Sequence, residues 1–177
     1  MICGYKPDNP CDSLKSMGLV NKDDLLGKWK LKHLERIECE NDIKKVPDFN
    51  SPISIEFNKD SASSYFIEKD SSLKAFHAGL TINGCDAGYS ILNTNDSDPS
   101  SSSSILSTKN SKNNSLKINI GICTAKGGSS LEMSWENRII RALDNTKCYT
   151  LTNNNKGLFL YYNNPDDNKN LMYFESY

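Results

Sequence analysis

The sequence predicts an α+β fold in which mostly antiparallel β-strands form a curled sheet or incomplete barrel with one packed helix, at about residues 130–144. Eight or nine short segments alternate apolar and polar residues between turn-forming residues, which is typical of antiparallel sheets with one buried face. A single segment instead repeats its apolar residues with the period of an α-helix. These two patterns decide the fold class.

The first expected strand begins at Trp29 and reaches Ile37. By alternation, Trp29, Leu31 and His33 lie on one side of this strand, and mostly charged residues lie on the other. We therefore expect a long, half-buried strand with His33 facing the core.

The other expected strands are shorter, and most of them alternate in the same way. They cover residues 53–57, 64–67, 76–83, 88–92, 116–120, 148–151, 158–162 and 171–174. Their inward positions and the apolar face of the helix give a predicted core that includes Trp29, Leu31, Ile55, Phe57, Phe66, Leu80, Ile82, Ile118, Trp135, Ile139, Leu143, Leu151, Leu160 and Phe174.

The expected helix begins after Ser129, which has Glu132 three residues later, the pattern of a capping box. Its apolar residues fall on one face of the helix; they are Leu131, Trp135, Ile139, Ala142 and Leu143. We expect this face to cover an open side of the sheet.

The chain is expected to contain one domain, at residues 25–177, after an irregular leader at residues 1–24 that shows no sustained period. Within the domain, residues 93–115 hold nine Ser and five Asn, but only Ile105 and Leu106 as large apolar residues. This composition indicates an insertion loop.

The charge balance gives no sign of a nucleic-acid partner, because 21 Lys and Arg residues face 22 Asp and Glu residues and the net charge is −1. No window reaches about 18 apolar residues, so no transmembrane segment is expected. Residues 1–20 lack the basic and apolar regions of a signal peptide, and we therefore expect a cytoplasmic protein. The alternative is a secreted protein, if Met1 is an added start on a mature chain.

The six cysteines do not form a metal-binding pattern. None of them forms a C-x-x-C pair, and the two histidines give no zinc-finger spacing, so we expect no metal and no cofactor. In the cytosol all six thiols are expected to be free. In a secreted protein the expected bridges are Cys3–Cys11 and Cys39–Cys148.

A cysteine nucleophile needs a base within hydrogen-bond reach, and only His33 and His77 can serve as that base. His33 is expected to face the core and His77 to lie at the rim of its strand. This placement disfavours a catalytic Cys–His pair, and a cysteine-based hydrolase or redox protein is kept only as an alternative.

Aromatic residues gather on the last two expected strands and at the C-terminus: Phe159, Tyr161, Tyr162, Tyr173 and Tyr177. Alternation directs some of these rings inward and others to the outer face. Tyrosine suits a binding surface because it joins a rigid apolar ring to one polar tip. We therefore take Phe159, Tyr161, Tyr162 and Tyr173 as candidate binding residues, with cross-strand stabilisation of the sheet as the alternative.

Several short motifs follow one another along the chain: Leu26-Gly27-x-Trp29-x-Leu31, Pro52-x-Ser54-Ile55-x-Phe57, Ile82-Asn83-Gly84-Cys85-Asp86, Thr124, Glu136-x-x-Ile139-Ile140-x-Ala142-Leu143, Tyr149-x-Leu151, Leu158-x-Leu160 and Met172-x-Phe174. Their order resembles the META/HslJ domain family over about residues 24–175. A lipocalin shares the G-x-W start but carries its helix after the eighth strand, whereas at least three strands are expected here after the helix. The sequence departs from the family pattern at Asp86, where Asn is usual, and at Gly128, where Cys is usual.

The resemblance implies a compact domain of antiparallel strands with one packed helix, in a family without an established enzymatic activity. Such domains occur in bacterial envelope-associated proteins and in protozoan proteins linked to virulence or secretion. Read as structure alone, Gly84 permits a tight turn, Cys85 packs as a small apolar residue, and Trp29 and Trp135 anchor the core.

We therefore expect a non-enzymatic META/HslJ-like binding or interaction module that is a monomer. Its expected partner is a protein or a small apolar ligand. A small lipid or ligand carrier of the lipocalin type is a further alternative.

Overall fold

The computed structural model describes residues 11, 22–36, 39–63, 66, 70–92, 115–152, 154–163 and 169–177. Most of the expected leader and residues 93–114 of the expected insertion loop therefore lie outside the described residues.

Within the described residues, the elements with defined bounds follow one another in this order. They are the 3-10 helix η1 (Lys22–Leu25), β1 (Gly27–Arg36), β2 (Cys39–Lys45), β3 (Ser54–Ser61), β4 (Lys74–Gly79), β5 (Gly84–Leu92), β6 (Ser115–Cys123), α3 (Ser130–Asp144), β7 (Thr146–Leu151), β8 (Gly157–Tyr162) and β9 (Leu171–Ser176).

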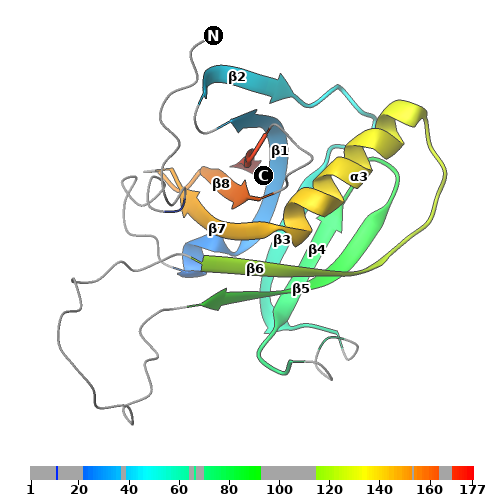
Figure 1. The fold of residues 1–177 in the computed structure, drawn as a ribbon. Helices are drawn as coiled ribbons and strands as arrows, with labels where there is room; N and C mark the ends of the chain where they lie inside the picture. Colours follow the sequence, from blue (N-terminus) through cyan, green and yellow to red (C-terminus); the bar gives the residue numbers. More distant parts are fainter. Residues whose placement is uncertain are drawn as a thin grey trace.

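The strands form one antiparallel sheet that closes on itself (Figure 1). Neighbours in the sheet run in the order β1-β3-β4-β5-β6-β7-β8-β9, and β9 pairs back with β1 to complete an eight-stranded barrel. Strand β2 lies outside this ring and pairs with the C-terminal half of β1. The predicted α+β class, with mostly antiparallel strands, is confirmed, and the sheet is a closed barrel rather than an incomplete one.

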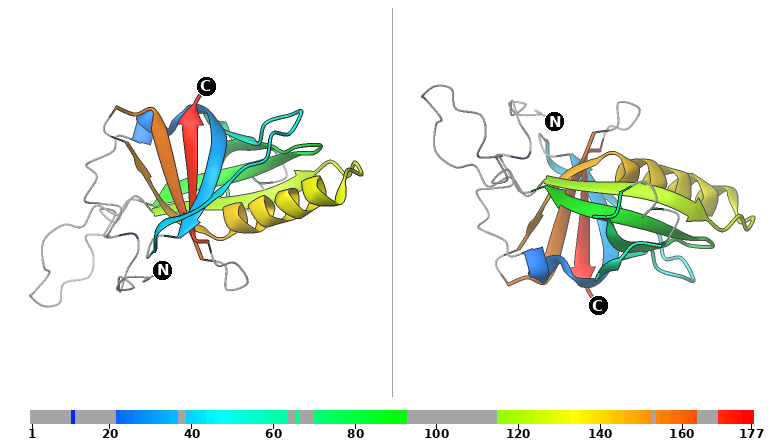
Figure 2. Two further views of the ribbon diagram at one scale, coloured as in Figure 1. Left: turned by 90° about the horizontal axis from the view of Figure 1, so that it is seen from above. Right: turned by 90° about the horizontal axis from the view of Figure 1, so that it is seen from below.

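Helix α3 connects β6 to β7 and lies along one side of the barrel (Figure 2). Its start is the predicted capping box, in which the Ser129 hydroxyl accepts from the Glu132 N–H and the Glu132 side chain accepts from the Ser129 N–H. Trp135, Ile139 and Leu143 are buried in the core as expected. Leu131 is 55% exposed, so its predicted place on the buried face is wrong: it lies in the first turn, before the helix reaches the barrel.

A single core fills the inside of the ring. Each of its strands contributes at least one large buried side chain at an inward position: Trp29, Ile55, Phe76, Tyr89, Ile118, Tyr149, Leu160 and Phe174. An eight-stranded barrel is just wide enough for side chains to fill its interior. The predicted core residues are buried with the exception of Ile82, which is only half-buried because it lies in the turn between β4 and β5 and packs over Gly128.

The first strand contains an irregularity that the alternation rule did not anticipate. The register against β9 shifts between Leu31 and His33, as a β-bulge does, and the side-chain alternation changes phase at Lys32. Leu34 is therefore fully buried, whereas His33 faces outward, which corrects the prediction that His33 faces the core.

Two further segments differ from the prediction. Strand β2 was not expected, because its sequence CENDIKK has no apolar alternation. The strand expected at residues 64–67 is wrong at the one position described there, because Phe66 is helical and its carbonyl accepts from the Asp70 N–H at 2.9 Å.

Four cysteines form two disulfides, Cys11–Cys148 and Cys85–Cys123. For these residues the expectation of free thiols is wrong. The alternative bridges Cys3–Cys11 and Cys39–Cys148 are wrong as well, because Cys11 and Cys148 are bonded to each other. Cys85 and Cys123 are register partners on the adjacent strands β5 and β6, a proximity that depends on strand pairing.

Among the described residues, no helix is both long and apolar enough to cross a membrane.

Candidate functional site

Three of the four candidate aromatic residues lie on the outer face of the barrel. Phe159 and Tyr161 are at outward positions of β8, and Tyr173 is at an outward position of β9, where Phe159 is its register partner. His33 of β1 is the register partner of Tyr173 on the other side. We call these four residues, His33, Tyr173, Phe159 and Tyr161, the aromatic strip.

Tyr173 is the central ring of the aromatic strip. Its ring centroid lies 4.9 Å from that of His33 and 4.8 Å from that of Phe159, so neighbouring rings cover it from both adjacent strands. Burial raises the pKa of the Tyr173 phenol, and the nearby Glu175 adds to the shift, which keeps the hydroxyl protonated at neutral pH.

Gly157 makes room for Tyr173. A Cβ atom at Gly157 would lie 2.8 Å from Cε2 and 2.9 Å from the hydroxyl oxygen of Tyr173. The tyrosine ring therefore packs directly on the backbone where β8 begins. Beside it lies a hollow of about 400 Å³, lined by Thr152, Asn154, Lys156, Gly157, Tyr173, Glu175 and Ser176.

Tyr161 and Phe159 belong to a small apolar cluster on the outside of the barrel. It contains the buried residues Cys148 and Leu171, and it includes Cys11, which the Cys11–Cys148 disulfide holds against β7. Cys148 is 2% and Leu171 is 4% exposed, although both are at outward positions. The outer face of β7, β8 and β9 is therefore more apolar than a simple solvated strand face.

The fourth candidate, Tyr162, is in the wrong place for binding a partner. It faces into the barrel and is fully buried in the main core. The alternation from Phe159 and Tyr161 accounts for this, since Tyr162 follows Tyr161 directly. Tyr177 is 65% exposed and lies beneath the Lys28 ammonium, which is 4.9 Å from its ring centroid.

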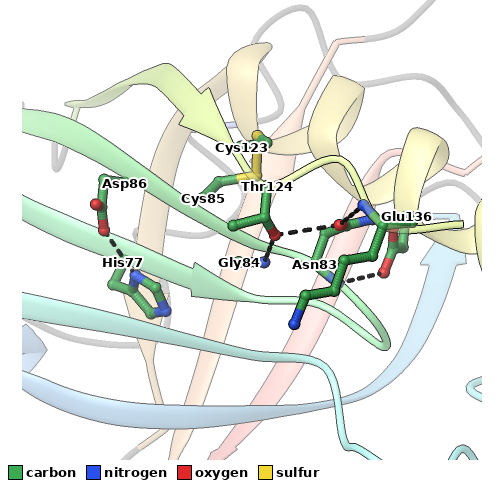
Figure 3. The surroundings of a disulfide bond; sticks show 9 residues. His77, Asn83, Gly84, Cys85, Asp86, Cys123, Thr124 and Glu136 are labelled. Atoms are coloured by element: carbon green, nitrogen blue, oxygen red, sulfur yellow. Dashed lines mark hydrogen bonds and ion pairs between the residues drawn. A yellow bond between two sulfur atoms is a disulfide. The ribbon is translucent and has the colours of Figure 1, made fainter.

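The motif residues Gly84, Cys85, Thr124 and Glu136 meet in one hydrogen-bonded network (Figure 3). The Glu136 carboxylate accepts from the backbone N–H groups of Ile82 and Asn83, at 2.7 and 3.1 Å. It also accepts from the Thr81 hydroxyl at 2.9 Å and from the Asn83 side-chain amide at 2.7 Å. Helix α3 is thereby bonded to the turn between β4 and β5.

Asn83 and Thr124 extend this network to the end of β6. The Asn83 side-chain oxygen accepts from the Thr124 hydroxyl at 3.1 Å and from the Lys126 N–H at 2.7 Å. The Thr124 hydroxyl oxygen in turn accepts from the Gly84 N–H at 3.1 Å. The Cys85–Cys123 disulfide ties the same two chain segments covalently.

Glu136 is 4% exposed and yet remains ionised at neutral pH. Burial acts to raise its pKa, but the hydrogen bonds from Ile82, Asn83 and Thr81 outweigh burial and hold the pKa below its usual value. All of these partners belong to the chain itself. The geometry is that of a structural anchor between the helix and the barrel.

The remaining motif residues also have structural partners. Trp29 is buried and its indole N–H donates to the Leu25 carbonyl at 2.9 Å. Gly27 has a φ of 115°, which favours glycine where the chain enters β1. Asp86 lies on the outer face, where its carboxylate is 2.9 Å from Nδ1 of His77, and Leu143 is fully buried.

Neither histidine is placed to activate Cys11, Cys85, Cys123 or Cys148, the four cysteines whose side chains the structure describes. His33 lies in the aromatic strip with Nε2 3.5 Å from the Glu35 carboxylate, and His77 pairs with Asp86. Cys11, Cys85, Cys123 and Cys148 are bonded as disulfides and present no thiolate in this state. In the part of the chain that the structure describes, no group of three or more His, Cys, Asp or Glu side chains could hold a metal ion.

Comparisons with models of known protein families, with curated proteins and with solved structures found no match.

Sequence reasoning missed His33, Leu171 and Cys11 as neighbours of the candidate aromatic residues. The bulge at Lys32 places His33, the disulfide places Cys11, and the pairing of β8 with β9 places Leu171. None of these three features leaves a local sequence signal. It also missed Asn83 as the centre of the polar network. The sequence offered one signal of this network. Asn83-Gly84 is a turn-forming pair, and the predicted helix has a glutamate beside its buried face.

Proposed function

We propose that this chain is a non-enzymatic, META/HslJ-like interaction module that binds a partner protein through the aromatic strip. The observation that carries the proposal is that Tyr173, Phe159 and Tyr161 lie together on the outer face. Strand alternation alone would equally have allowed these three rings to face the core. Partly covered aromatic rings beside polar groups are the typical composition of the energetic centre of a protein interface.

The filled barrel supports a protein partner over a carried ligand. Lipocalin-like carriage needs a cavity inside the ring, whereas here Tyr149, Leu160 and Phe174 belong to one cluster of buried residues to which all eight strands of the ring contribute. The outer hollow beside Tyr173 is open and partly polar, which suits a side chain of a partner better than a lipid.

The location is part of the proposal. Two disulfides among the described cysteines favour an oxidising compartment, which is the secreted alternative, over the cytoplasm. We propose that the module acts outside the cytosol as a monomer.

The test is quantitative capture on immobilised protein, with extract proteins measured by mass spectrometry. Tyr161→Ala and Tyr173→Ala should each lose the specific partner, while the melting temperature falls by only a few degrees. Tyr177→Ala is the matched control, because Tyr177 is an exposed tyrosine outside the aromatic strip, and it should retain the partner. Unchanged capture by both strip variants, together with a large loss of stability, would show that the rings only hold the sheet together.

A further inference from the structure

The hollow beside Tyr173 lies where a strand position has no side chain. Gly157 is at an outward position at the start of β8, one outward position before Phe159 of the aromatic strip. Its register partner is Glu175 on β9, which lies between β8 and β1 (Figure 2). A larger residue would fill this place, since a Cβ at Gly157 would already lie 2.6 Å from the Thr152 methyl carbon. The hollow is therefore continuous with the aromatic strip through Tyr173.

The turn after β7 presents a side-chain donor to this hollow. The Asn154 Oδ1 atom accepts from the Thr152 hydroxyl at 2.7 Å and from the Lys156 N–H at 3.1 Å. A backbone N–H can only donate, so the atom that it meets is the amide oxygen, and the Asn154 amino group is left as a donor. The Thr152 hydroxyl oxygen also accepts from the Gly157 N–H at 2.9 Å. These hydrogen bonds hold Asn154 in place before any partner binds.

Two further donors line the hollow. The Tyr173 hydroxyl lies beside Gly157, and it makes no hydrogen bond with the residues that the structure describes. Lys156 is exposed, and its ammonium forms no ion pair within the described part of the chain. The hollow thus combines a phenol, an amide and an ammonium group whose donors await an acceptor.

The carboxylate that lines the hollow is already balanced. Glu175 is the one acidic residue among the lining residues, and its carboxylate is 2.9 Å from the Lys32 ammonium. An incoming anion therefore meets donors and a neutral ion pair. An ionised carboxylate, which only accepts hydrogen bonds, complements this set.

The surface next to the hollow is positively charged. Lysines gather on this outer face: Lys28, Lys30 and Lys32 on β1, and Lys156 before β8. Lys30 is the register partner of Glu175, and Lys28 is the register partner of Glu56 on β3. Four lysines thus face two glutamates, in a chain whose net charge is −1. Such a patch attracts an acidic partner.

We propose that the hollow and the lysines beside it receive an acidic segment of the partner protein, with one aspartate or glutamate carboxylate in the hollow. This carboxylate accepts from the Tyr173 hydroxyl, the Asn154 amino group and the Lys156 ammonium. Further acidic residues of the segment lie over the lysines of β1. The inference rests on the proposed function, since the aromatic strip binds an apolar part of the same partner.

The donors in the hollow favour a carboxylate side chain over a sulfated polysaccharide or an anionic membrane. Those ligands would bind the exposed lysines without needing neutral donors at a recessed place. Tyr173 and Asn154 are such donors, and a flexible acidic side chain can reach them. Tyr173 is also the central ring of the aromatic strip, so the same partner contacts both.

The probe is a hexapeptide, blocked at both ends, in which two glutamates precede and two follow a leucine-tryptophan pair. A matched peptide carries glutamine in place of each glutamate. Each peptide is titrated into the 15N-labelled full chain, and NMR amide shifts report where it binds. We expect the glutamate peptide to shift the Gly157 amide and the Asn154 side-chain amide. It should bind about tenfold more tightly than the glutamine peptide at low salt, and this difference should shrink as salt is added.

Three variants sharpen the test. Tyr173→Phe removes the hydroxyl but keeps the ring between His33 and Phe159, and it should weaken the glutamate peptide about tenfold and the glutamine peptide less. Lys156→Glu should weaken the glutamate peptide about fivefold at low salt. Lys74→Glu is the matched control, because Lys74 is an exposed lysine on β4, on the opposite side of the ring from β8. It should change binding less than about twofold.

Three results would overturn the proposal. The first is equal affinity for the glutamate and glutamine peptides, or no binding by the glutamate peptide. The second is binding of the glutamate peptide that neither Tyr173→Phe nor Lys156→Glu weakens. The third is a shift of the Gly157 amide with a heparin fragment or phosphatidylserine vesicles but not with the glutamate peptide, because another class of anion would then be the occupant.

The inference and the proposed function can fail separately. If both peptides shift the amides of Phe159 and Tyr161 with equal affinity, the aromatic strip binds but its partner is not acidic, and only the inference is overturned. If the glutamate peptide shifts Gly157 but not Phe159 or Tyr161, and Tyr161→Ala leaves its affinity unchanged, the acidic site is supported and the proposed function is contradicted.

Discussion

Asn83 holds the Glu136 carboxylate at both oxygens, with its backbone N–H 3.1 Å from Oε1 and its side-chain Nδ2 2.7 Å from Oε2. The two residues are 53 positions apart, and they join the turn after β4 to the second turn of α3. This pair explains how a helix inserted between two strands is fixed on a closed barrel. It also explains how the motif residues Gly84, Cys85, Thr124 and Glu136 meet in one network.

Glu136→Gln should destabilise the fold by about 1–3 kcal/mol, because an amide at Oε2 would face the Asn83 amide donor in a buried place. Urea unfolding followed by circular dichroism measures the change. Glu132→Gln is the matched control, since Glu132 is a glutamate of the same helix that forms the capping box and has no hydrogen bond to the described part of the barrel, and we expect it to cost much less stability than Glu136→Gln. Equal losses for both variants would contradict the anchoring role of Glu136.

The stability of the protein should fall in acid partly because of Glu136. Its pKa is lowered in the folded state from 4.5, so the carboxylate stabilises the fold above about that pH. The stabilisation is lost as the pH falls from 4.5 through the folded-state pKa. Free energies of unfolding between pH 7 and pH 3 should therefore decline less steeply for Glu136→Gln than for the wild type. Parallel declines would assign the acid sensitivity to other carboxylates, such as Asp42 and Asp70, whose pKa values are also lowered.

The Cys85–Cys123 bridge should contribute to stability, because it closes a loop across a sequence separation of 38 residues. The loop-entropy model gives about 3–4 kcal/mol for a loop of this length. A Cys85→Ala/Cys123→Ala double variant should show this loss in urea unfolding. Intact-mass analysis after alkylation, with and without reductant, should find both thiols protected in the native protein. Quantitative alkylation of Cys85 and Cys123 without reductant would refute the bridge.

Gly121→Ala should displace Phe66 from the outer face of the barrel. The new methyl group would lie 2.0 Å from the Phe66 ring and 2.9 Å from the Asp86 carbonyl oxygen, so the ring has to move. We expect a loss of about 1–3 kcal/mol, as for other overpacked sites. Gly127→Ala is the control, because a Cβ at Gly127 has no neighbour within 4 Å. Thermal unfolding of the two variants measures the difference.

Local patterns were enough to predict most strands and the helix. Trp29 and Leu31 of β1, Leu158 and Leu160 of β8, and the capping box at Ser129 follow from alternation and from spacing alone. These features depend on residues that are close in sequence, which is why the core was largely predictable.

The features that the sequence alternation did not predict depend on pairing between segments that are distant in the sequence. The bulge at Lys32 forms only against β9, and it reverses His33 and Leu34 relative to strict alternation. Strand β2 is polar because it lies outside the ring, and Cys85 meets Cys123 only because β5 and β6 pair in one register. The aromatic strip was predicted only in part. Alternation groups the rings of β8 and β9 on one face of the sheet, but it does not determine which face of the sheet is turned outward.

The central claim is that the aromatic strip binds a protein, and hydroxyl-radical footprinting of the captured complex tests it most directly. Mass spectrometry compares the oxidation of Phe159, Tyr161 and Tyr173 in the free and bound protein, with Tyr177 as the internal reference. Binding on the strip predicts that oxidation of the three residues falls several-fold while that of Tyr177 is unchanged. Equal oxidation of the three residues in the free and bound protein would contradict the claim.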